Sequence, residues 1–62
     1  MASVLSGAVR EVREGFIVLN AGTRIIVSAR IRPDGLVPGA RVSVKARPQG
    51  AEWIAEDVQV ND

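Results

Sequence analysis

The sequence predicts a small all-β domain in which five strands form a closed or partly open barrel without a substantial helix. Short runs rich in Val and Ile recur five times, and segments rich in Gly, Pro, Asn and Asp separate them. No stretch repeats its apolar residues with helical spacing. With 62 residues and no cysteine, the chain forms one domain, which we expect to be ordered over about residues 4–60. A barrel suits such a chain because it limits exposed strand edges.

The first predicted strand, Leu5–Arg13, requires a bend. Its apolar residues Val9 and Val12 lie three positions apart. A straight strand, whose side chains alternate between two faces, cannot direct both of them inward. A bulge near Arg10-Glu11 would direct both toward the core, and barrels use such bulges to turn corners.

The next two predicted strands are Phe16–Asn20 and Arg24–Ile31. The former follows a glycine turn at Gly15 and is apolar on both faces, whereas the latter alternates with period two. One of its faces has Ile25, Val27, Ala29 and Ile31; the other has Arg24, Ile26, Ser28, Arg30 and Arg32. Residues 33–39 contain two prolines and two glycines, so they predict turns and exclude a helix.

The last two predicted strands are Arg41–Arg47 and Glu52–Val60, joined by a turn at 48–50. The earlier one alternates cleanly, with an apolar face of Val42, Val44 and Ala46. In the later one, the side chains that share a face by parity are Ile54, Val58 and Val60, with Trp53 and Ala55 opposite. We expect Asn61 and Asp62 to be frayed.

The net charge of +1 hides an uneven distribution. Residues 24–47 contain six basic side chains and one acidic one, whereas residues 48–62 contain four acidic side chains and no basic one. This pattern predicts a polarised surface. Arginine outnumbers lysine by seven to one, and its planar guanidinium suits phosphate and aromatic bases.

Several classes of function are excluded by composition. The chain lacks His, Cys and Tyr, so most metal sites and most nucleophile–base pairs are impossible, and we expect neither an enzyme nor a bound cofactor or metal. Glu56 and Asp57 are adjacent on a strand and point to opposite faces. The N-terminal residues do not resemble a signal peptide and no apolar run has the length of a membrane span, which predicts a cytoplasmic protein.

Three segments resemble the oligonucleotide/oligosaccharide-binding (OB) fold. Gly7–Val12 and Gly15–Leu19 resemble the opening of RNA-binding OB repeats in ribosomal and ribonuclease proteins. Leu36–Val44 resembles the entry to the fourth strand in those repeats, in cold-shock proteins and in the small OB-type bacterial translation initiation factor. The chain is also similar to uncharacterised bacterial OB-like domains. Cold-shock proteins carry several aromatics and a histidine on strands two and three, where this chain has only Phe16.

The resemblance implies weak binding of single-stranded RNA or DNA. Phe16 would stack on a base, and arginines of the third strand and nearby loops would contact phosphates. The candidate nucleic-acid-binding residues are Phe16, Arg24, Arg30, Arg32, Lys45 and Arg47.

Other roles for the same residues remain open. Phe16 could instead fill the barrel, the arginines could pair with acidic side chains across strands, and Trp53 could be a second stacking platform or a lid on one barrel end. The alternative function is a structural, protein-interaction or self-assembly barrel, in which Val18 and Ile26 are buried by a protein partner or a second copy. A third hypothesis is a simplified barrel selected for folding alone.

Overall fold

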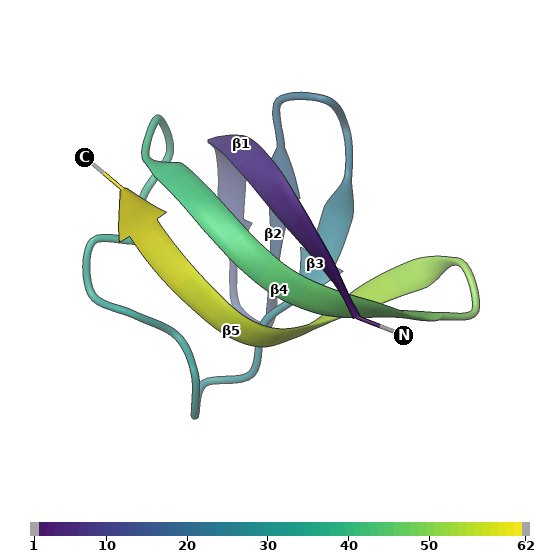
Figure 1. Ribbon diagram of the computed structural model, residues 1–62. Helices are drawn as coiled ribbons and strands as arrows, with labels where there is room; N and C mark the ends of the chain where they lie inside the picture. Colours follow the sequence, from purple (N-terminus) through teal and green to yellow (C-terminus); the bar gives the residue numbers. More distant parts are fainter. Residues whose placement is uncertain (1, 62) are drawn as a thin grey trace.

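The computed structural model describes residues 2–61 and contains five strands within that range, with no helix (Figure 1). The strands are β1 (Ser3–Arg13), β2 (Phe16–Leu19), β3 (Arg24–Ile26), β4 (Arg41–Gln49) and β5 (Glu52–Asn61). Hydrogen bonds link them in the closed order β1-β2-β3-β5-β4. Over the described residues there is accordingly no helix that could cross a membrane. The predicted all-β fold of five strands is confirmed.

The ring of strands is uneven. β1 has 11 residues and β3 has three, so the structure is not an evenly shaped barrel. Neighbouring strands are antiparallel except β3 and β5, which run parallel and meet through two pairs of residues, Ile25 with Trp53 and Ile26 with Ile54. The hairpin of β4 and β5 extends beyond the rest of the ring on the side of the N-terminus (Figure 1).

The predicted bend in β1 is confirmed. The register of β1 with β2 shifts between Val9 and Glu11. At this bulge the N–H of Val9 donates to the carbonyl of Ala40 (2.9 Å), and the N–H of Gly39 donates to the carbonyl of Val9 (2.8 Å). Val9 is buried and Val12 packs against the core. The first part of β1 therefore pairs with β4, and the part after the bulge pairs with β2.

The third strand is shorter than predicted. The expected strand Arg24–Ile31 ends at Ile26, and the chain then turns. The carbonyl of Ser28 accepts from the N–H of Ile31 (3.1 Å), and the hydroxyl of Ser28 accepts from the N–H of Arg30 (3.2 Å). Serine commonly forms such local bonds in turns. The prediction of a basic strand face that includes Arg30 is therefore wrong.

The pairing of β3 with β2 ends at the start of β2. β2 begins at Phe16, and the preceding carbonyl, that of Gly15, accepts from the N–H of Val27 (2.9 Å). Beyond this point β2 offers no further residue, and the backbone groups on that side of the chain need other partners. Val27 still points inward and is buried, as the alternation of the predicted strand requires, but Ala29 is exposed.

A second bulge changes the faces of β5. The register with β4 shifts so that Glu56 is left without an opposite residue. Ala55 and Val58 are consequently both buried, although they differ in parity. Trp53 packs against the core, whereas Ile54 is half-buried and does not belong to it. The predicted grouping of Ile54 with Val58 and Val60 on one face is therefore wrong. β5 also continues to Asn61, and Asp62 lies outside the described residues.

The core is aliphatic. Val42, Val44 and Ala46 point inward as predicted. Each fully buried Val, Leu or Ile contributes about 1.5–3 kcal/mol, and no polar side chain among residues 2–61 is buried. The core residues are Val9, Ile17, Leu19, Ile25, Val27, Leu36, Val42, Val44, Ala46, Ala55 and Val58. The only phenylalanine, Phe16, is absent from this set, so it does not fill the interior of the barrel.

Candidate functional site

One continuous row of side chains crosses all five strands on the outside of the ring. Arg13 of β1 is opposite Phe16 of β2, which is opposite Ile26 of β3. Ile26 is beside Ile54 of β5, which is opposite Arg47 of β4. Side chains at directly opposed positions project from the same face of a sheet. We call these five residues the outer row; its middle is apolar and each end is an arginine.

The alternation of each strand directs the outer row away from the core. Ile17 and Ile25 are fully buried, so their neighbours Phe16 and Ile26 project to the other side. Phe16, Ile26 and Ile54 are each half-buried, which leaves part of every apolar side chain accessible. The row follows the curve of the closed ring, and its path across the four gaps between the five strands is about 19 Å, at about 4.8 Å for each gap.

Arg24 covers the ring of Phe16. Its guanidinium carbon lies 4.1 Å from the ring centroid, a cation–π contact that contributes about 0.5–1 kcal/mol at an exposed site. Its Nε is also 3.9 Å from a carboxylate oxygen of Glu52, and 56% of the Arg24 side chain is exposed. The guanidinium thus presents its open side to solvent above the only phenylalanine.

Arg13 is held by a neighbour on its own strand. Its Nη2 and Nε donate to the Oε1 atom of Glu11 at 2.6 and 3.1 Å. Exposed pairs of this kind contribute at most about 1 kcal/mol to stability. An anionic ligand can therefore compete for Arg13 at a small cost.

The two loop arginines lie in different places. Arg32 donates from Nη1 to the backbone carbonyl of Arg13 (3.1 Å), which brings it to the β1 end of the outer row. Arg30 is exposed in the turn after β3 and is not on the face of that strand. The structure therefore brings Arg32 to the candidate site and leaves Arg30 outside it.

The two basic residues of β4 are separated by the second bulge. Arg47 is opposite Ile54 and ends the outer row. Lys45 lies before the bulge, between Val4 of β1 and Asp57 of β5. Of this predicted pair, only Arg47 joins the candidate site. Within residues 2–61, neither Arg47 nor Lys45 forms an ion pair with an acidic side chain.

Trp53 is not on the outer row. It is half-buried, packs against the core and is paired with Ile25 and Pro48. This position fits a lid on the core better than a stacking platform. Val18, the other outward residue of β2, is only 8% exposed. Phe16 is therefore the accessible outward side chain of β2.

Sequence reasoning missed three residues of this face: Arg13, Ile54 and Glu52. A two-residue turn between β1 and β2 would have placed Arg13 opposite Phe16, and this signal was present in the sequence. Ile54 could not be found because the bulge at Glu56 reverses its parity relative to Val58. Glu52 approaches Arg24 only through the parallel pairing of β3 with β5.

No group of three or more potential metal-ligating side chains is present in the part of the chain that the structure describes. Comparison of the chain with protein-family models, with curated proteins and with solved structures finds no match. The candidate site must therefore be interpreted from its own chemistry.

Proposed function

We propose that this protein is an OB-type barrel that binds single-stranded RNA or DNA weakly along the outer row, without catalysis. The observation that carries the proposal is the composition of that row: three apolar side chains on adjacent strands, with an arginine at each end. Proteins that bind single strands without sequence preference combine aromatic platforms for bases with cations for the backbone. The strand order of the closed ring is compatible with an OB barrel.

Bases would stack over Phe16 and its covering guanidinium, while Arg13, Arg32 and Arg47 would contact phosphates. Arginine stacks on aromatic faces and also forms paired hydrogen bonds with phosphate oxygens. The row length of about 19 Å accommodates a few nucleotides, in line with the short sites of OB domains.

Weak affinity follows from the same geometry. The face offers one aromatic ring instead of several, and a stacked base contributes only about 1–3 kcal/mol. Two of its arginines are paired, Arg13 with Glu11 and Arg24 with Glu52. A phosphate group must replace these contacts when it binds, which lowers the net free energy of binding that each arginine contributes.

The alternative proposal is that the outer row docks a protein. In that case Val18 and Ile26 would supply the apolar contact. Val18 is only 8% exposed, so of these two residues only Ile26 offers accessible apolar surface, and the arginines at both ends of the outer row favour an anionic ligand.

Fluorescence anisotropy of labelled single strands at two salt concentrations tests the proposal. Removing one phosphate contact with Arg47→Ala should reduce the slope of log affinity against log salt by about 0.7. Arg41→Ala removes an equal charge from β4 away from the outer row and is the matched control. Phe16→Ala should weaken binding by about 5- to 150-fold, and Phe16→Tyr should retain most of it. Absence of binding at low salt, or equal slopes for the two arginine variants, would refute nucleic-acid binding along the row.

A further inference from the structure

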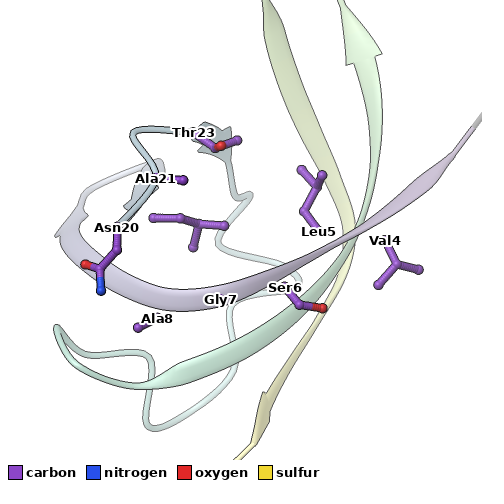
Figure 2. A pocket seen from close by; sticks show the side chains of 9 residues that line it. Val4, Leu5, Ser6, Gly7, Ala8, Asn20, Ala21 and Thr23 are labelled. Atoms are coloured by element: carbon purple, nitrogen blue, oxygen red, sulfur yellow. The ribbon is translucent and has the colours of Figure 1, made fainter.

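The first half of β1 has one open edge. Residues Ser3–Ala8 pair with β4, but β2 begins to pair with β1 only at Val9. On the open side lies a hollow of about 360 Å³ between β1 and the turn that joins β2 to β3. Figure 2 shows Asn20, Ala21 and Thr23 across this hollow from β1.

The backbone groups that face the hollow belong to Val4 and Ser6. The carbonyl of Ala8 accepts from the N–H of Asn20 (2.9 Å), so it points toward β2, whereas Val9 bonds the segment that enters β4. Backbone groups alternate in direction along a strand. Val4 and Ser6 therefore direct their N–H and C=O groups into the hollow, and no other strand of the described chain pairs with them there.

This edge lacks the residue types that protect edges in soluble proteins. Proteins discourage strand addition with charged residues, proline or bulges at an edge. The segment Ala2–Gly7 contains no charged residue and no proline. Val4 is also 69% exposed, which is unusually high for a large apolar side chain in this structure.

We propose that a second copy of this chain pairs with the open edge, so that the β1 strands of two copies lie antiparallel about a two-fold axis at Leu5. In this arrangement Val4 of each copy is opposite Ser6 of the other, and their outward groups form four backbone hydrogen bonds. Pairing ends at Ala8, because Asn20 already occupies its carbonyl.

The register makes the edge complementary to itself. On the inner face, Leu5 is opposite Val44, which is opposite Val58. The two-fold axis joins this row to its copy through Leu5 and creates one apolar row across six strands. On the outer face, the row of Val4, Lys45 and Asp57 meets the uncharged row of Ser6, Ser43 and Gln59 of the other copy. This pairing brings no like charges together. Pairing with a strand of a different protein would not guarantee this.

The dimer leaves the outer row accessible, because it uses β1 before the bulge, whereas the row uses β1 after it. It is therefore independent of nucleic-acid binding. Its contact is small compared with stable interfaces, which bury about 800 Å² of each partner. We expect a reversible dimer whose population rises with concentration.

Cysteine cross-linking tests the register directly, since the chain has no native cysteine. In the proposed dimer the two Leu5 residues form a non-hydrogen-bonded pair with Cα atoms about 4.5 Å apart, within the range of a disulfide. The two Val4 residues are diagonal neighbours about 7–8 Å apart, beyond the usual range. Under mild oxidation Leu5→Cys should form a covalent dimer of twice 6.6 kDa, and Val4→Cys should not, although Val4 is the more exposed.

Sedimentation of the unmodified chain provides a test that does not depend on the cysteine variants. The average mass should rise with concentration. Val4→Pro should abolish the rise, because it removes an N–H that points away from β4, and Val4→Thr, which keeps that N–H, should preserve it. A chain that stays monomeric up to about 1 mM would overturn the proposal that a second copy pairs with this edge. Faster cross-linking of Val4→Cys than of Leu5→Cys, or a Val4→Pro variant that still dimerises, would also overturn it.

Discussion

Replacing Glu52 by Gln should strengthen the binding of single-stranded nucleic acid. The Glu52 carboxylate is 3.9 Å from the Nε atom of Arg24, whose guanidinium covers Phe16. Both side chains of the pair are about half exposed, at 56% for Arg24 and 46% for Glu52. In the variant the guanidinium keeps its place over the ring, but it no longer has an anionic competitor for phosphate.

The size of the effect follows from the exposure of the pair. Exposed ion pairs contribute about 0.2–1 kcal/mol, which corresponds to a gain in affinity of about 1.4- to 5-fold once the pair no longer has to be broken. Removing one negative charge near the ligand acts in the same direction. Both effects are screened by salt, with a Debye length of about 10 Å at 0.1 M, so the gain should shrink as the salt concentration rises.

Anisotropy titrations of Glu52→Gln and Glu56→Gln at low and moderate salt would measure this gain. Glu56 is an exposed acidic residue of the same strand at the second bulge, so its variant changes the net charge equally and removes no partner from Arg24. Thermal unfolding of both variants checks that stability is unchanged. If the two variants bind with equal affinity, or if Glu52→Gln binds more weakly than the parent chain, the reasoning about Arg24 is refuted.

Two further predictions concern stability. Ile25→Ala should cost about 2–5 kcal/mol, a large part of the about 3–9 kcal/mol expected for a chain of this size, because Ile25 is fully buried; urea unfolding measures it, and a loss no greater than that of Ile26→Ala on the outer row would contradict the assigned faces. Gly15→Ala should cost about 1–2 kcal/mol, since Gly15 has φ of 94° and an added Cβ would meet no atom within 4 Å, so backbone strain acts alone; an unchanged midpoint of chemical denaturation would be inconsistent with this strain.

The sequence was sufficient to predict which side chains point inward wherever the alternation of apolar residues along a strand matches its pairing with the neighbouring strands. The inward face of β4 was predicted from Val42, Val44 and Ala46, because these residues alternate without interruption and the bulge between β4 and β5 adds its extra residue to β5. The corner in β1 followed from the spacing of Val9 and Val12, since only an extra residue can bring both to one side.

The remaining differences arise from the neighbours of a strand, which its own residues do not specify. The alternation of Arg24–Ile31 continues beyond Ile26, but pairing stops where β2 begins. The bulge at Glu56 depends on the register with β4. Of the predicted site residues, Phe16, Arg24, Arg32 and Arg47 lie on or beside the outer row. Arg30 lies in the turn after β3, and Lys45 lies on the other side of the second bulge.

β3 and β5 meet through only two residue pairs, the shortest pairing in the ring, and under the proposed function this contact would couple ligand binding to closure of the ring. Opening this contact would leave the other four strand pairings in place, so it should cost less than global unfolding. The outer row crosses this contact between Ile26 and Ile54. A ligand that lies along the row contacts both sides and is bound fully only by the closed ring. At ten times its dissociation constant, such a ligand would favour closure by about 1.4 kcal/mol. Because the N–H of Val27 donates to Gly15 beside β2, the N–H of Ile26 points toward β5, and slower hydrogen exchange at Ile26 would report occupancy. Even a weak ligand would in this way help to keep the ring of strands closed.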